Sequence, residues 1–130
     1  MGQWGESMFE SDGVLDFLSE FNESLDFSMV ENAVTNVLES DNYIDVDDCY
    51  NLVAAAEIIA TIKGHKSDEF PDHLDFKASG FQEKINDKLI KDFKKSLKKV
   101  LLKDGSELFE LWEDPDLLEG YYEDLIDRLS

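Results

Sequence analysis

The stretch from Leu52 to Ala60 most strongly constrains what this chain can fold into. It reads Leu-Val-Ala-Ala-Ala-Glu-Ile-Ile-Ala, so a helix built from it is apolar almost all round and carries one charge, Glu57. A helix without a polar face must lie at the centre of its fold, covered by other elements. We therefore predict a central helix from about Asp45 to Lys63. Lys63 and the following Gly64 are typical of a helix end.

Two segments before it repeat apolar residues every three or four positions, as helices with one buried face do. The first starts at Asp12, whose carboxylate we expect to cap the helix. The second starts at Ser28, where Glu31 would complete a capping box. Their expected buried faces are Val14, Phe17, Leu18, Phe21 and Leu25, and Val30, Ala33, Val34 and Val37.

The C-terminal half shows the same periodicity. We expect a long, lysine-rich helix over 81–102, a short helix over 106–112, and a last helix that begins at Pro115 with Asp114 as its cap. The apolar stripes are Phe81, Ile85, Leu89, Phe93, Leu97, Val100 and Leu101, and then Leu118, Tyr122, Leu125 and Leu129. No segment alternates with the period of a strand. The sequence therefore predicts an all-α bundle of about five or six helices in a single domain over 1–130.

Two segments fall outside the helical pattern. Residues 1–11 contain Trp4 and Phe9, whose large apolar side chains we expect to anchor the N-terminus against the bundle. Residues 64–79 read as a long loop, because they combine Gly64, Pro71 and scattered charges. Loops of this length in a small domain often carry function.

Charge limits the possible partners. The 130 residues include 31 Asp and Glu against 12 Lys and Arg, a net charge of −19. Nucleic acids and anionic membranes would repel such a chain, whereas a protein with a basic surface would attract it. The charge is also segregated: residues 1–76 hold 18 acids and 2 bases, and residues 77–103 hold 3 acids and 9 bases. Cys49 has no second cysteine to pair with, and no secretory signal is recognisable, so we expect a cytoplasmic protein.

Catalytic and metal-binding patterns are weak. Asp45, Asp47 and Asp48 resemble the start of a calcium loop, but the glycine and glutamate that such a loop needs are missing, so we interpret them as the charged start of a helix. His65 and His73 lie in the long loop among carboxylates, which leaves a zinc site as a remote alternative. Cys49 reads as a small core residue. We expect no catalytic residues, no metal and no cofactor.

Four motifs resemble a family of small bacterial proteins described as a domain of unknown function. They are Met1-Gly2-x-Trp4-Gly5 with Phe9-Glu10-x-Asp12 and Asp16-Phe17, then Ala54-Ala55-Ala56-Glu57, Ser106-Glu107-Leu108-x-x-Leu111-Trp112, and Asp127-Arg128-Leu129. The chain departs from the family pattern in having Tyr121 and Tyr122 where a tryptophan is usual, and in its lysine-rich middle. We interpret Trp4, Phe9, Asp12 and Trp112 within these motifs as structural residues, while the resemblance implies a fold and a bacterial or phage source and supplies no catalytic residue.

Small acidic proteins of this kind resemble immunity proteins encoded beside contact-dependent or polymorphic toxins. Many such toxins are nucleases with a basic cleft, which carboxylates can fill. We therefore expect an immunity protein whose partner is a basic toxin. A DNA mimic directed against restriction or other defence proteins is the main alternative, and a metal-dependent enzyme using His65 and His73 is a second. The expected partner-binding carboxylates are Asp41, Asp45, Asp47, Asp48, Asp68, Glu69, Asp72 and Asp75.

Overall fold

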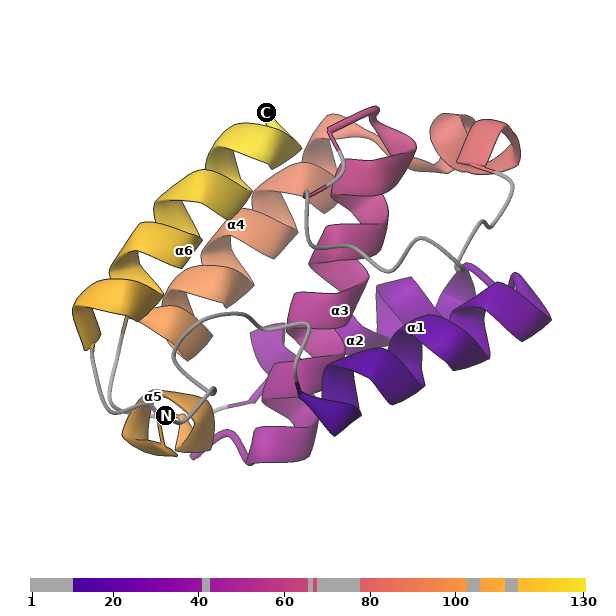
Figure 1. Ribbon diagram of the computed structural model, residues 1–130. Helices are drawn as coiled ribbons and strands as arrows, with labels where there is room; N and C mark the ends of the chain where they lie inside the picture. Colours follow the sequence, from indigo (N-terminus) through magenta and orange to yellow (C-terminus); the bar gives the residue numbers. More distant parts are fainter. Residues whose placement is uncertain (1–10, 41–42, 66, 68–77, 103–105, 112–114) are drawn as a thin grey trace.

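The computed structural model describes residues 11–40, 43–65, 67, 78–102, 106–111 and 115–130 (Figure 1). The elements are α1 (Asp12–Ser24), α2 (Ser28–Leu38), α3 (Val46–Ile62), the 3-10 helix η3 (Ala78–Lys84), α4 (Asp87–Leu101), α5 (Glu107–Leu111) and α6 (Pro115–Leu129). Within the described residues there is no strand, only an isolated β-bridge between Ile44 and Ser106. The all-α prediction is confirmed. Trp4, Phe9 and Trp112 lie outside the described ranges, so their structural roles stay predictions.

Helix α3 occupies the centre, as its sequence predicts. Every residue from Leu52 to Ala60 is buried, and α3 contacts each of the other described helices. In Figure 1, α1 lies on one side of α3 and α4 and α6 lie side by side on the other, while α2 passes behind α3 and contacts both α3 and α4. None of the described helices is long and apolar enough to pass through a membrane.

The ends of α3 follow from local signals. Asp45 is the N-cap, and its carboxylate accepts a hydrogen bond from the Asp48 amide at 3.0 Å. At the other end Gly64 adopts a φ of 92°, a left-handed conformation that glycine adopts without steric cost. The predicted boundaries, Asp45 and Lys63, are therefore the two cap residues of the helix.

The predictions for the starts of α1 and α2 are wrong in detail. Ser11, not Asp12, is the N-cap of α1. Asp12 lies exposed in the first turn, where its negative charge interacts favourably with the positive end of the helix dipole. Helix α2 does begin at Ser28, but no capping box forms. Instead the Asp26 carboxylate accepts hydrogen bonds from the Ser28 amide at 3.0 Å and the Ser28 hydroxyl at 2.7 Å. These bonds lower the pKa of Asp26.

Leu25 does not belong to the buried stripe of α1. It takes the left-handed conformation that ends the helix, with a φ of 51°, and its side chain is 39% exposed. The other four residues predicted for that stripe are buried.

The long helix predicted over 81–102 is two elements. A break at Asn86 separates η3 from α4, and the Asn86 side chain caps α4 by accepting from the Leu89 amide at 2.8 Å. In η3, the Phe81 ring lies 5.5 Å from that of Phe21 and 5.7 Å from that of Phe27. We attribute the break in the predicted helix to the contacts of Phe81 with these two aromatic rings and to the cap at Asn86, although the apolar stripe continues across it.

Cys49 provides a direct test of the core. Its side chain is fully buried in α3, and burial raises the pKa of the thiol to about 11. A thiolate is the reactive form, so at about pH 8 we expect Ellman's reagent to modify this cysteine only after unfolding in urea. Urea-unfolded protein, which should release one equivalent per chain, is the control. Rapid modification of the folded protein would contradict the buried placement.

Candidate functional site

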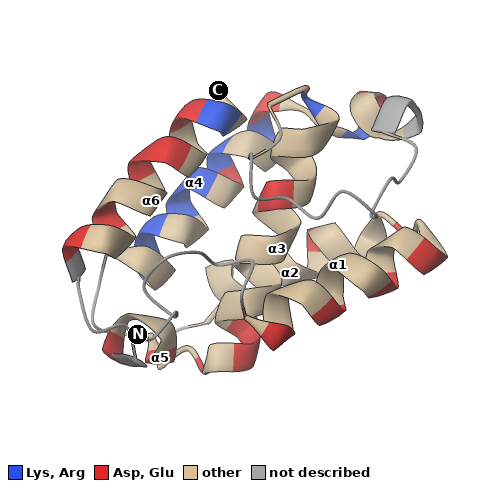
Figure 2. Cartoon of the chain, in the orientation of Figure 1, with Lys and Arg blue, Asp and Glu red and all other residues tan. Residues whose placement is uncertain are grey.

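Exposed carboxylates form a row along α1. Asp12, Asp16, Glu20 and Glu23 are all exposed, and their spacing of four, four and three residues places them on one face of the helix (Figure 2). None of them was predicted from the sequence to be a binding residue, although the periodicity of their positions was a readable signal.

The three predicted carboxylates at the start of α3 have different surroundings. Asp45 is committed to capping the helix. Asp48 is half-buried, and its burial, together with the nearby charges of Asp45 and Asp47, raises the pKa of its carboxyl group. Of the three, Asp47 alone is both exposed and without a capping bond. The other predicted partner-binding residues, outside the described ranges, are Asp41, Asp68, Glu69, Asp72 and Asp75.

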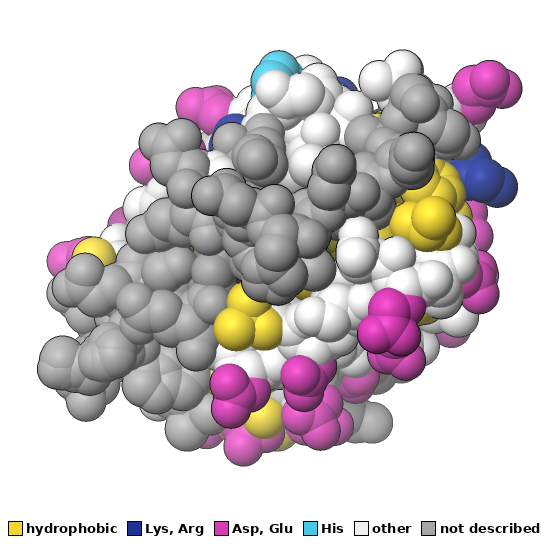
Figure 3. Space-filling model, turned by 45° about the vertical axis from the view of Figure 1, so that its right-hand side comes forward, with side chains coloured by type: hydrophobic (Ala, Val, Ile, Leu, Met, Phe, Trp, Pro, Cys, Tyr) yellow, Lys and Arg dark blue, Asp and Glu magenta, His cyan; other side chains and the backbone are white. Residues whose placement is uncertain are grey.

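The fold brings Asp47 together with the row on α1. A groove of about 400 Å³ between α1, α2 and the start of α3 has Asp16, Glu20 and Asp47 among its lining residues, with Phe17, Met29 and Tyr50 contributing its apolar part. Figure 3 shows acidic side chains gathered along the lower part of one face, with hydrophobic side chains between them. We call this feature the acidic groove.

Gly13 allows the two helices beside the acidic groove to approach closely. A Cβ atom at this position would lie 2.5 Å from Cδ2 of Tyr50, which is too close for any real contact. A glycine here therefore lets the first turn of α1 pack directly on the Tyr50 ring of α3. Gly13 and Tyr50 both line the acidic groove.

Basic residues gather on α4, across α3 from α1 (Figure 2). Lys99 has a structural task, since its ammonium group donates to the carbonyl oxygens of Val37 at 2.9 Å and Ser40 at 3.0 Å, at the end of α2. Lys88 pairs with Asp92 at 2.9 Å on the surface. Lys95 and Lys98 are exposed, so the lysine-rich outer face predicted from sequence is present.

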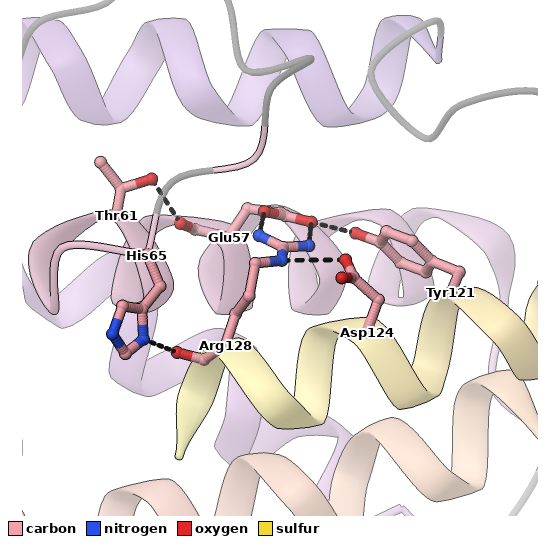
Figure 4. A network of polar contacts seen from close by, with 6 residues as sticks. All are labelled: Glu57, Thr61, His65, Tyr121, Asp124 and Arg128. Carbon is pink, nitrogen blue, oxygen red and sulfur yellow. Dashed lines mark hydrogen bonds and ion pairs between the residues drawn. The ribbon is translucent and has the colours of Figure 1, made fainter.

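A buried ion pair joins α3 to α6 (Figure 4). The Glu57 carboxylate is 0% exposed, and Arg128 approaches it with both terminal nitrogens, at 2.6 Å to Oε1 and 2.9 Å to Oε2. The hydroxyl of Tyr121 donates a further hydrogen bond to Oε2. Such a two-pronged contact is the strongest geometry available to this pair of side chains.

Further polar contacts surround this pair. Arg128 Nε lies 2.9 Å from Oδ2 of Asp124, and Nδ1 of His65 donates to the Arg128 carbonyl at 2.7 Å. Burial alone lowers the pKa of Arg128, but the hydrogen bond and charge of Glu57 raise it above its ordinary value. Burial also raises the pKa of Tyr121, with the charge of Glu57 adding to the shift. At neutral pH the guanidinium is charged and the phenol is a neutral donor.

The buried Glu57 carboxylate therefore finds its hydrogen-bond donors within this cluster. Three donors occupy the two oxygens of Glu57, which suits a link between two helices better than a site that takes up a substrate. Nothing in the part of the chain that the structure describes groups three His, Cys, Asp or Glu side chains as a metal site would need. His65 contacts α6, while His73 lies outside the described residues.

The sequence contained one signal for the ion pair, a lone acid within an apolar run. Its partner could not be predicted from the sequence, since Arg128 lies 71 residues away.

A family model described as a domain of unknown function (DUF4259) matches residues 2–124. The chain belongs to this family. The expectation of a small family of unknown function is thereby confirmed, and Glu57, Tyr121 and the acidic groove all lie within the DUF4259 match. Comparison with curated proteins and with solved structures gave no match.

Proposed function

We propose that this DUF4259 protein is an immunity protein, which binds and neutralises a basic bacterial toxin in the cytoplasm. The observation that carries the proposal is the concentration of exposed carboxylates on α1 and at Asp47, on the side of α3 away from the basic α4. A nuclease toxin of a contact-dependent or polymorphic system fits this surface best, because its phosphate-binding cleft must be basic.

Inhibition by this surface needs no catalytic group. Carboxylates that enter a basic cleft compete with the phosphates of the substrate. Segregated charge also steers the encounter, since the field of an acidic face raises association rates by about 10- to 1,000-fold at low salt. The cluster around Glu57 is consistent with the proposal, because the hydrogen bonds from Tyr121 and Arg128 explain the buried carboxylate as a structural link between helices without a catalytic role.

A DNA mimic is the alternative that uses the same carboxylates. Neighbouring acids four residues apart on α1 rise by about 6 Å along the helix, whereas one DNA strand places a phosphate about every 3.4 Å along its axis. The row thus offers a charge for roughly every second phosphate of one strand, which fits a cleft lined with a few basic side chains better than a long duplex tract. A metal-dependent enzyme has less support, since Nδ1 of His65 is bonded to α6.

Charge reversal on α1 tests the proposal. Changing Asp16, Glu20 and Glu23 to lysine should slow association with the co-purified partner by about tenfold and weaken neutralisation, because it reverses the steering field. A matched control reverses three exposed acids of α6, Glu119, Glu123 and Asp127, with the same change in net charge. Association can be measured by stopped-flow mixing at two salt concentrations.

The partner itself separates the alternatives. Co-purification from the native operon should yield a toxin, and the wild-type affinity should fall with added salt. Recovery of a restriction or defence protein would favour the DNA mimic. Binding that ignores both salt and the α1 reversals would refute an acidic interface. Asp47→Lys extends the test to α3, and it is a cleaner variant than reversal of Asp45, which would also remove the helix cap.

A further inference from the structure

We propose that the acidic groove is a binding site for a single arginine side chain of the protein partner. This inference deepens the proposed function, on which the identity of the partner rests. The groove itself is defined by residues of three helices, and its occupant is argued from the chemistry of its lining.

The groove combines two kinds of surface. Asp16 and Glu20 approach it from α1 and Asp47 from α3, so that three exposed carboxylates from two helices surround one hollow. Phe17 and Tyr50 contribute apolar lining, and because each residue is only 9% exposed, a small part of each side chain faces the hollow. At about 400 Å³ the hollow suits one long side chain and its immediate neighbours, and it lies near the lower end of the range of about 300–1,000 Å³ seen for small-ligand sites.

Arginine matches this lining better than other side chains. Its planar guanidinium stacks on aromatic faces and pairs with carboxylates through two parallel hydrogen bonds. Its aliphatic stem can lie along apolar surface while the charged end reaches the rim. Lysine offers the charge without the plane, and is more strongly hydrated. A neutral or acidic side chain carries no positive charge to pair with the three carboxylates.

A second hollow lacks this complementarity. It lies between α2 and α4, has a volume of about 230 Å³, and is lined by Lys84 and Lys88 as well as Glu31 and Asp92. Charges of both signs there favour no single partner charge. The acids of α6 are exposed on a helix surface, which gives a control surface of equal charge.

Small peptides test the groove without the partner. We would titrate ¹⁵N-labelled protein with the capped tripeptides acetyl-Gly-Arg-Gly-amide and acetyl-Gly-Lys-Gly-amide and follow amide shifts by NMR. The arginine peptide should shift the amides of Gly13, Phe17 and Tyr50 more than those of α6, and should bind more tightly than the lysine peptide. Loss of all three groove charges, through Asp16→Asn, Glu20→Gln and Asp47→Asn, should weaken its binding by about tenfold. Neutralising Glu119, Glu123 and Asp127 in the same way should change it by less than about twofold.

Each outcome bears on the inference. Equal shifts over α1 and α6, no discrimination between arginine and lysine, or unchanged binding by the groove variant would each overturn it. The single variant Asp47→Asn repeats the test should the triple variant alter the spectrum elsewhere, because the cap of α3 is formed by Asp45 and stays in place.

The outcomes for the groove and for the proposed function can be told apart. Arginine binding in the groove without neutralisation of a toxin would support the groove and refute the immunity function. Toxin neutralisation that survives loss of the groove charges, but is lost when Asp12 and Glu23, the exposed α1 acids that do not line the groove, are reversed to lysine, would refute the groove and leave the function standing.

Discussion

Replacing Arg128 by methionine should lower the free energy of unfolding by about 3–5 kcal/mol, the usual cost of removing one partner from a buried ion pair. The reason is the position of Glu57. Its carboxylate is fully buried, and Arg128 supplies two of the three donors that compensate its charge. Without the guanidinium, the buried Glu57 carboxylate has no cationic partner.

Urea unfolding followed by circular dichroism measures this loss. The matched control is Asp124→Asn, which removes the exposed arm of the same network, where Arg128 Nε meets a carboxylate that is 62% exposed. We expect that change to cost less than about 1 kcal/mol. A double variant with methionine at both Glu57 and Arg128 should recover much of the lost stability, because it removes the orphaned charge. Equal stability of Arg128→Met and wild type would contradict the structural role of the pair.

Truncation of Phe21 to alanine should cost a similar amount, about 3–5 kcal/mol, as is usual for a buried phenylalanine. Its side chain is 0% exposed on the inner face of α1, and its ring contacts that of Phe81 in η3. The variant therefore leaves a cavity and also removes a support of the 3-10 helix.

Phe81→Ala is the comparison that separates these two effects. Phe81 is only half-buried, so we expect a smaller loss of stability from this change. Hydrogen exchange in η3 should rise in both variants, whereas exchange in α1 should rise only in Phe21→Ala. A Phe21→Ala variant as stable as wild type would show that the ring does not belong to the core.

The helices were predictable where their signals are local. The ends of α3, at the N-cap Asp45 and at the C-cap Lys63 followed by Gly64, depend on only a few neighbouring residues, and both ends were predicted correctly. The break at Asn86 was missed, because the apolar stripe continues across it and the deciding contacts come from Phe21 and Phe27. The periodicity marks Phe21 and Phe81 as residues of apolar stripes, but it does not show that the two rings contact each other.

The candidate site was less predictable than the fold, for the same physical reason. Asp47 was read as a binding residue, but its groove partners Asp16 and Glu20 come from another helix. Glu57 stood out as a lone charge in an apolar run, yet nothing in the sequence pairs it with Arg128. Which charges meet is decided by how the helices cross.

The link between Glu57 and Arg128 also bears on the order of folding. Its two ends are 71 residues apart, so the loop that it closes spans α4 and α5 as well as most of α6. Contacts this distant in sequence are costly to form early, since the intervening chain must first lose its freedom. We therefore expect Glu57 to stay hydrated until α6 docks against the middle of α3. On this expectation the docking of α6 and the desolvation of Glu57 occur together and late in folding, so the ion pair should act mainly by slowing unfolding.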